Sequence, residues 1–210
     1  MMKKTITAIT AQNRDGKRCN VFLDGEFFSG IQLITVMKNR LKVGMVIAEE
    51  ELNEIVASSE REVAMQKALG YVGKYMRTKA QVAGYLKKKG FLKETVDSVI
   101  GKLQEYGYVN DFAYSDGYLK ERNLVKGKRL MAYELKLKGV DERTIDEALS
   151  EAPDEEEGAY RTARKFLKDK TLDFETIGKC YRRLISRGFD YDVVKSVIER
   201  IKKENENFED

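Results

Sequence analysis

Apolar residues along the chain repeat with a period of 49 residues. The period is marked by three equally spaced glycines, Gly90, Gly139 and Gly188. A leucine stands four positions before each glycine, and apolar residues stand six, nine and ten positions after it: Val96, Val99 and Ile100; Ile145, Ala148 and Leu149; Val194, Val197 and Ile198. Offsets of six, nine and ten lie on one face of a helix. The pattern therefore predicts three tandem copies of one helical unit.

Each copy is expected to contain three helices: a leading helix, a middle helix that ends at the glycine, and a closing helix after it. The glycines fit the left-handed residue just past a helix end, where a side chain would be costly. Asp141 and Asp190 stand two residues past their glycines and are good N-caps for the closing helix. The first copy has Leu92 at this position and lacks that cap.

Start signals also mark two of the other helices. Thr78 and Gln81 have the spacing of a capping box, in which Thr78 reaches forward and Gln81 reaches back. They predict the start of the first middle helix. Asn110 or Asp111 is expected to cap the leading helix of the second copy.

The first thirty residues follow a different pattern. The stretches "TITAITAQ" and "RCNVFLDGEFFSG" are rich in β-branched and aromatic residues, with Asp-Gly pairs at 15–16 and 24–25. Asp-Gly between strand-like runs is typical of a hairpin turn, so we expect two or three short antiparallel strands. Helical patterning begins near Ile31, breaks at "LKVGMVI" and resumes at Glu49, where three acidic residues suit a helix N-terminus.

Together these patterns predict a mainly α fold. We expect three tandem three-helix repeats that form an elongated curved array, with a small N-terminal β-hairpin and α region. The predicted limits are 1–58 for the N-terminal hairpin and helix region, 59–108 for repeat 1, 109–157 for repeat 2 and 158–210 for repeat 3.

The chain is mildly basic, and its basic residues are unevenly placed. It has 39 Lys and Arg against 35 Asp and Glu, a net charge of +4. From Lys74 to Lys93 there are seven basic residues and no acidic one. Basic residues recur on or beside each middle helix, which favours a face for a partner or DNA. The residues assigned to this face, hereafter the basic set, are Arg77, Lys79, Lys87, Lys88, Lys89, Lys126, Lys128, Arg129, Arg182, Arg183 and Arg187.

Any single member of the basic set also has a simpler interpretation. Lys87, Lys88 and Lys89 stand where lysines interact favourably with the helix dipole and the last carbonyl groups. Capping does not require the basic residues that stand away from this helix end, and a merely solvated face would mix charges. We therefore favour a binding face for the set as a whole, while capping stays open for each lysine.

Five tyrosines flank the lysine-rich segment: Tyr71, Tyr75, Tyr85, Tyr106 and Tyr108. They have the residue type that stacks on bases in single-strand binders. Aromatic residues at helical spacing are more often part of a core, and we favour that interpretation.

The composition excludes several kinds of chemistry. There is no histidine, and the two cysteines, Cys19 and Cys180, are too few for a zinc finger or a disulfide framework. No phosphate loop or dinucleotide motif is present. The acidic runs Glu49–Glu51 and Asp154–Glu157 are interpreted as first turns of helices, although a carboxylate metal site is an alternative. We expect no enzyme, no catalytic residue, no cofactor and no metal.

Location is predicted from apolar runs and cysteine usage. No stretch is long and apolar enough for a signal peptide or a membrane span. Sparse cysteines suit a reducing compartment. We expect a cytoplasmic protein without a membrane partner.

Four segments in the repeat region carry a resemblance to a known family. They are "RTKAQVAGYLKKKGF", "GYVNDFAYSDGYLKERN", "KGKRLMAYELKLKGV" and "RRLISRGFDYDVVKSVI". In this order they resemble the RecX regulatory family, over roughly residues 68–201. The N-terminal region also looks like the extension found in some members. Departures are small: Gln81-Val82 replaces the usual Glu-Leu, and no aspartate cap follows Gly90.

The resemblance implies a negative regulator of the RecA recombinase. Members are curved stacks of three-helix repeats that bind the RecA filament on single-stranded DNA. They limit filament assembly, and thereby ATP hydrolysis, recombination and the SOS co-protease activity. For this chain the resemblance implies RecA as partner, with possible direct DNA contact, and we expect a monomer.

Two other functions stay open from the residues alone. The first is a stand-alone nucleic-acid-binding module that uses the basic helices and has no RecA role. The second is a hydrolase that uses acidic residues, which no motif supports.

Overall fold

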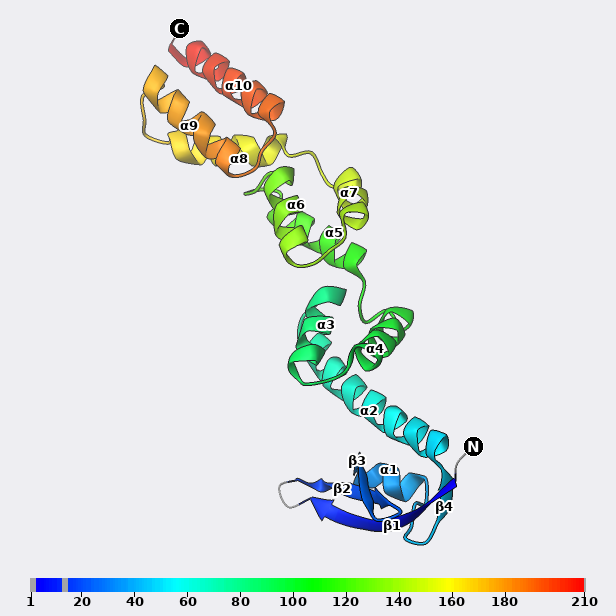
Figure 1. Cartoon of the computed structure of the whole chain (residues 1–210). Helices are drawn as coiled ribbons and strands as arrows, with labels where there is room; N and C mark the ends of the chain where they lie inside the picture. The colour runs from blue at the N-terminus through cyan, green and yellow to red at the C-terminus, as the bar shows by residue number, and fades with distance from the viewer. Residues whose placement is uncertain (1–2, 13–14, 210) are drawn as a thin grey trace. The chain divides into compact units, whose positions relative to one another are not determined.

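The computed structural model describes residues 3–12 and 15–209 (Figure 1). The chain forms two compact units, which we describe separately. The first contains the residues up to 74 together with 83–108, and the second contains 75–82 together with the residues from 109 onward. The mainly α fold with three three-helix repeats and a small N-terminal β region is confirmed. The limits at residues 58, 108 and 157 stay a proposal; α2 (Glu49–Val72) runs continuously through residue 58.

The N-terminal region is a four-stranded antiparallel sheet, larger than the expected hairpin. Its strands are β1 (Lys3–Gln12), β2 (Asp15–Leu23), β3 (Glu26–Gln32) and β4 (Val46–Ala48), in the order β3-β2-β1-β4. Sequence analysis missed β4, because three residues are too short for a detectable alternation.

One of the two predicted hairpin turns is confirmed. Asp24 and Gly25 have φ values of 48° and 92° and join β2 to β3, as an Asp-Gly type I′ turn requires. Asp15 and Gly16 do not form the expected turn, because both residues belong to β2. Asp15 already pairs with Gln12 across the ladder, and residues 13–14 between them lie outside the described residues.

The sheet packs against helix α1 (Leu33–Lys38) and the start of α2, as Figure 1 shows. Its core contains Ile6, Val21, Leu23, Ile31, Val36, Leu41, Ile47 and Leu52. The buried hydroxyls of Thr35 and Ser59 form a hydrogen bond of 2.7 Å, so neither is left unsatisfied beside this core. The three acidic residues predicted for a first turn do begin α2.

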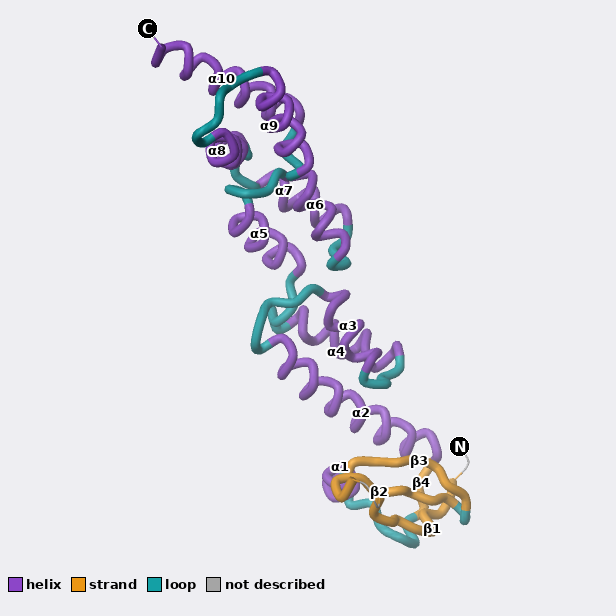
Figure 2. Tube along the Cα trace, turned by 90° about the vertical axis from the view of Figure 1, so that its left-hand side faces the viewer, coloured by secondary structure: helices purple, strands orange, loops and turns teal. Residues whose placement is uncertain are grey.

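The first repeat contains α2, α3 (Lys79–Lys88) and α4 (Lys93–Glu105). Figure 2 shows α4 running beside α2, and the two helices are in contact. Val96, Val99 and Ile100 are buried as the 49-residue pattern predicts. The tyrosine prediction is only partly right. Tyr71 and Tyr85 stack on each other with ring centroids 4.3 Å apart, whereas the other three tyrosines are more than half exposed: Tyr75, Tyr106 and Tyr108.

The second and third repeats have the predicted three helices each. They are α5 (Asp111–Arg122), α6 (Lys128–Leu137) and α7 (Glu142–Glu151), followed by α8 (Glu156–Leu167), α9 (Phe174–Ser186) and α10 (Tyr191–Glu209). Equivalent residues build the two cores. Met131, Leu135, Ile145 and Ala148 in one correspond to Cys180, Leu184, Val194 and Val197 in the other.

The three glycines have the predicted left-handed conformation, with φ of 88°, 80° and 82°. In each repeat the residue after the glycine donates its amide hydrogen to a leucine carbonyl, and this leucine stands four positions before the glycine. This is the Schellman motif, so the period in the sequence is also a period in backbone geometry.

The predicted N-caps are also confirmed. Asp141 accepts from the Thr144 amide at 3.0 Å, and Asp190 accepts from the Asp192 amide at 3.1 Å. Thr78 and Gln81 form the reciprocal capping box, with both bonds at 3.2 Å. Of the two candidates for α5, Asn110 is the cap, accepting from Ala113 at 3.0 Å. Leu92 makes no side-chain cap.

Within the second unit, the glycine turns of repeats 2 and 3 also join neighbouring repeats. Thr78 Oγ1 donates to the carbonyl of Lys138, beside Gly139, at 2.7 Å. One period later, the Gly127 amide donates to the carbonyl of Arg187, beside Gly188, at 2.9 Å. The start of the middle helix of one repeat therefore packs on the glycine turn that ends the middle helix of the following repeat.

A carboxylate completes each of these junctions. Asp111 accepts from the amide of Lys79 at 2.7 Å, and Glu155 accepts from the equivalent amide of Lys128 at 2.6 Å. Glu155 is buried and also accepts from the amide of Asp190 at 2.6 Å. The donating amides of Lys79 and Lys128 are one period apart, but the carboxylates that accept from them stand at different positions of the repeat. No apolar pattern in the sequence indicates these contacts.

Candidate functional site

The structure places the basic set on the middle helices and their flanking turns. Seven members are exposed: Lys79, Lys87, Lys88, Lys89, Arg129, Arg182 and Arg183. Four are half-buried: Arg77, Lys126, Lys128 and Arg187. The role of the set in binding stays a prediction, but the surroundings of each residue separate those that hold the fold together from those that are available to a partner.

The lysines of repeat 1 are available. Lys87 and Lys88 occupy the last turn of α3, and Lys89 follows it. In the described part of the chain none of the three forms an ion pair. Lys89 Nζ lies 5.7 Å from the centroid of the Tyr85 ring, which in turn stacks on Tyr71. Arg77, which precedes α3, has its Cζ 5.5 Å from the Tyr75 ring centroid.

Lys126 is engaged within repeat 2. Its Nζ lies 2.5 Å from Glu134 Oε1, and the side chains are 20% and 26% exposed. The Tyr118 hydroxyl donates to the other oxygen of Glu134. Burial alone would raise the pKa of Glu134, but the hydrogen bonds from Lys126 and Tyr118 outweigh it and lower this pKa. Burial, followed by the same carboxylate, raises the pKa of Tyr118.

Lys128 and Arg187 are also held by intramolecular contacts. Lys128 Nζ donates to the carbonyls of Leu149 and Ala152 at 3.4 Å each, which is the expected use of a lysine at the end of a helix, here α7. Arg187 Nη1 donates to the Val125 carbonyl at 3.4 Å. The capping interpretation therefore describes Lys128 better than it describes the three lysines of repeat 1.

A hollow in repeat 3 brings two members of the basic set together with three lysines that sequence reasoning missed. The hollow measures about 350 Å³, and its basic lining residues are Lys165, Lys168, Lys170, Arg183 and Arg187. The missed lysines stand in the short run "KFLKDK" at the end of α8. Their local charge was a usable signal, but they lie away from the middle helices, to which the basic set was assigned.

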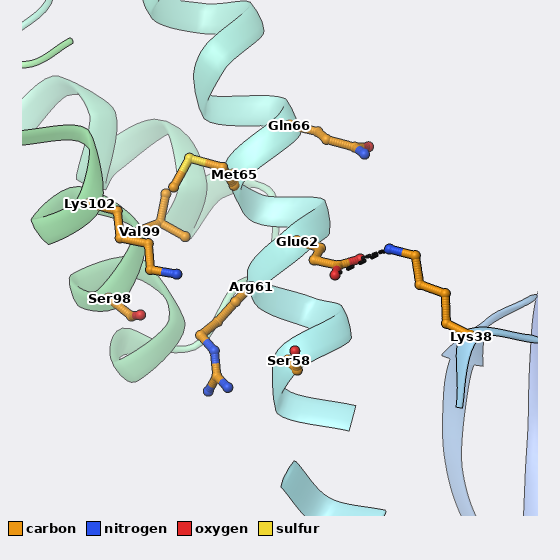
Figure 3. Close-up of a pocket in the computed structure, with 9 residues that line it drawn as sticks. All are labelled: Lys38, Ser58, Arg61, Glu62, Met65, Gln66, Ser98, Val99 and Lys102. Carbon is orange, nitrogen blue, oxygen red and sulfur yellow. Dashed lines mark hydrogen bonds and ion pairs between the residues drawn. The ribbon is translucent and has the colours of Figure 1, made fainter. Parts of the chain in front are cut away.

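A second hollow, between α2 and α4 of the first repeat, has a mixed lining (Figure 3). It measures about 470 Å³. Lys38 and Glu62 form an ion pair of 3.3 Å at its edge, and Figure 3 shows Arg61 and Lys102 nearby. Because both charges are present, this hollow offers no uniform field to an anionic partner.

Within residues 3–12 and 15–209, no group of three or more acidic or cysteine side chains is placed to hold a metal ion. Across the same residues, no helix combines the length and apolar character needed to cross a bilayer.

Comparison with known proteins places the chain in a family. Three family models match it: the regulatory protein RecX N-terminal domain over residues 4–48, the first RecX three-helix domain over 64–103 and the third over 154–198. These matches cover more than half of the chain. The chain belongs to the RecX family. The first match covers the sheet and α1, so the N-terminal region is a RecX domain, as the resemblance implied.

Individual RecX relatives match over nearly the full length. The chain is 32% identical to Regulatory protein RecX of Clostridium perfringens strain 13, covering 93% of this chain and 95% of the relative. It is 31% identical to Regulatory protein RecX of Bacillus licheniformis, covering 96% and 79%. A solved structure titled crystal structure of regulatory protein RecX matches with a TM-score of 0.67 and 25% identity, covering 93% of this chain and 99% of that one.

Proposed function

We propose that this chain is a negative regulator of the RecA recombinase. In this proposal it binds RecA filaments on single-stranded DNA, as a cytoplasmic monomer without enzymatic activity, and limits filament assembly, ATPase and SOS co-protease activity. The observation that carries the proposal is the likeness, over nearly the whole of this chain, to proteins named Regulatory protein RecX. The exposed lysines at the end of α3, which form no ion pair with any described residue, supply positive charge suited to an anionic filament.

The mechanism is differential binding. A protein shifts an assembly equilibrium only by as much as its affinities for the two states differ. A regulator that prefers capped or disassembled RecA therefore reduces the length of the filament, and ATP hydrolysis falls because it depends on assembled subunits.

The test measures ATP hydrolysis by RecA on single-stranded DNA with increasing amounts of the purified chain. Hydrolysis should fall as the chain is added, and the fall should be smaller when filaments are fully assembled beforehand. Unchanged hydrolysis at an excess of the chain would contradict the proposal.

A stand-alone nucleic-acid-binding module is the second candidate, and the basic hollow in repeat 3 favours it. This function predicts tight binding to free DNA with a steep dependence on salt, because bound cations are released from the phosphates. Weak binding to free DNA beside strong inhibition of RecA would reject it.

A further inference from the structure

The hollow in repeat 3 is built from one end of α8, the connection to α9, and the end of α9. Lys165 lies on α8, Lys168 and Lys170 follow it, and Arg183 and Arg187 come from the end of α9. Figure 1 shows that α8 and α9 lie together and are joined by a short connection. Basic residues from two helices and the segment between them thus line one hollow.

The charge of this hollow is uncompensated within the described residues. None of the five basic side chains forms an ion pair there, and no carboxylate lines the wall. Two nearby acidic residues are engaged elsewhere: Asp173 accepts from the Thr176 amide at 2.7 Å, and Glu175 pairs with Lys179 at 2.7 Å. Asp169 lines a neighbouring hollow together with Lys168 and Lys170, but it forms no ion pair with either lysine among the described residues. Five close positive charges repel one another unless an anion occupies the space between them.

Two of the cationic groups are held in place by an aromatic ring. Lys170 Nζ lies 3.5 Å from the centroid of the half-buried Phe166 ring, and Arg183 Cζ lies 5.4 Å from it. Cation–π attraction restricts both side chains. Arg187 is restricted by its bond to the Val125 carbonyl. Groups that are already ordered lose less entropy when a ligand binds.

We propose that this hollow binds consecutive backbone phosphates of a nucleic-acid strand. A single phosphate carries a charge of at most about −2, which leaves most of the five positive charges unbalanced. A strand supplies one negative charge per nucleotide and can pass through an open hollow. Because Lys170 covers the Phe166 ring, the site contacts the backbone and does not stack a base, so binding is independent of sequence. Its role during RecA regulation rests on the function proposed above, but the phosphate binding itself does not.

The test compares two double variants of the full chain that lose the same charge. Lys165→Gln with Lys168→Gln removes two cations from the hollow and spares the contacts to Phe166. Lys202→Gln with Lys203→Gln removes two exposed lysines from α10 of the same repeat. Binding of a fluorescent oligothymidylate is measured by anisotropy over a range of salt concentrations, and melting curves verify that both variants fold.

The hollow variant should bind on the order of tenfold more weakly at 0.1 M salt, and its log–log salt slope should be smaller by about 1.4, or about 0.7 for each lost phosphate contact. The control should change much less. The single Lys168→Gln variant should give about half the change in slope, which keeps the test decisive if the double variant fails to fold.

Equal losses in both variants, or no loss in either, would overturn the proposal. So would hollow-dependent binding of poly-glutamate without hollow-dependent binding of the oligonucleotide, because this result would assign the hollow to an acidic protein segment. RecA hydrolysis is measured in parallel with the unmodified chain. Failure to inhibit RecA, with DNA binding that still depends on the hollow, would remove the proposed function and leave this site standing.

Discussion

Repeats 1 and 3 end their middle helices with the same backbone motif in different surroundings. Gly90 and Gly188 both have positive φ, of 88° and 82°. A Cβ added at Gly90 would have nothing within 4 Å, whereas one at Gly188 would lie 2.4 Å from the backbone nitrogen of Leu130. In repeat 1 the glycine only ends a helix. In repeat 3 it also provides the space that a neighbouring repeat needs.

The largest expected effect follows from this difference. Gly188→Ala should lower the free energy of unfolding by more than about 3 kcal/mol, because it combines a strained left-handed residue with a clash against backbone. Gly90→Ala carries only the conformational strain, about 1–2 kcal/mol. Chemical denaturation of both variants provides the comparison. Equal losses would mean that the junction adapts to a Cβ at no cost.

The next effect tests the carboxylate that completes the junction between repeats 2 and 3. Glu155→Gln replaces one of two acceptor oxygens by an amide group that faces a backbone amide, so about 1–3 kcal/mol of stability should be lost. Glu156→Gln is the control, because Glu156 is exposed at the adjacent position. The melting temperature of Glu155→Gln should be lower than that of Glu156→Gln. Similar melting temperatures for both variants would contradict the structural role of Glu155.

A smaller and pH-dependent effect belongs to the Lys126–Glu134 pair of repeat 2. Because the folded-state pKa of Glu134 lies below its ordinary value of 4.5, the pair stabilises the fold above that pH. The stabilisation is lost as the pH falls through the lowered pKa.

Lys126→Met should therefore lower the free energy of unfolding by up to about 1 kcal/mol at neutral pH. The stability of this variant should also decline less steeply below pH 4.5. Denaturation midpoints measured from pH 3 to pH 7 test this. Parallel curves for the variant and the unmodified chain would show that the pair contributes nothing.

The smallest expected effect on stability concerns the three lysines of repeat 1. Replacing Lys87, Lys88 and Lys89 by Gln should cost only a few tenths of a kcal/mol for each residue if they merely favour the helix end. If they contact the filament, inhibition of RecA hydrolysis should fall strongly with little change in melting. The matched control replaces three exposed lysines of α10: Lys195, Lys202 and Lys203. Unchanged inhibition would favour the capping interpretation.

Much of the candidate site could not be read from sequence because it depends on the neighbours of each charge. Lys126 and Lys87 stand beside and on a middle helix, respectively, yet Lys126 is paired with Glu134 while Lys87 is exposed. Their sequence contexts do not reveal whether a carboxylate from the same repeat will face them. Lys165, Lys168 and Lys170 were missed for the same reason, because only the packing of α8 against α9 brings them near Arg183.

The sequence by itself determined that three helical repeats form, which aliphatic residues bury their shared face, and where the helices marked by a glycine turn or a capping residue start and stop. These features follow from local rules, since apolar periodicity selects a buried face, a glycine ends a helix, and a short polar side chain caps the next one. Only the tertiary structure decided which lysines are engaged in intramolecular contacts and which glycine lies against a neighbouring helix. It also decided where separate basic residues meet around one hollow. Those outcomes depend on distances between residues far apart in the chain, which local pattern does not encode.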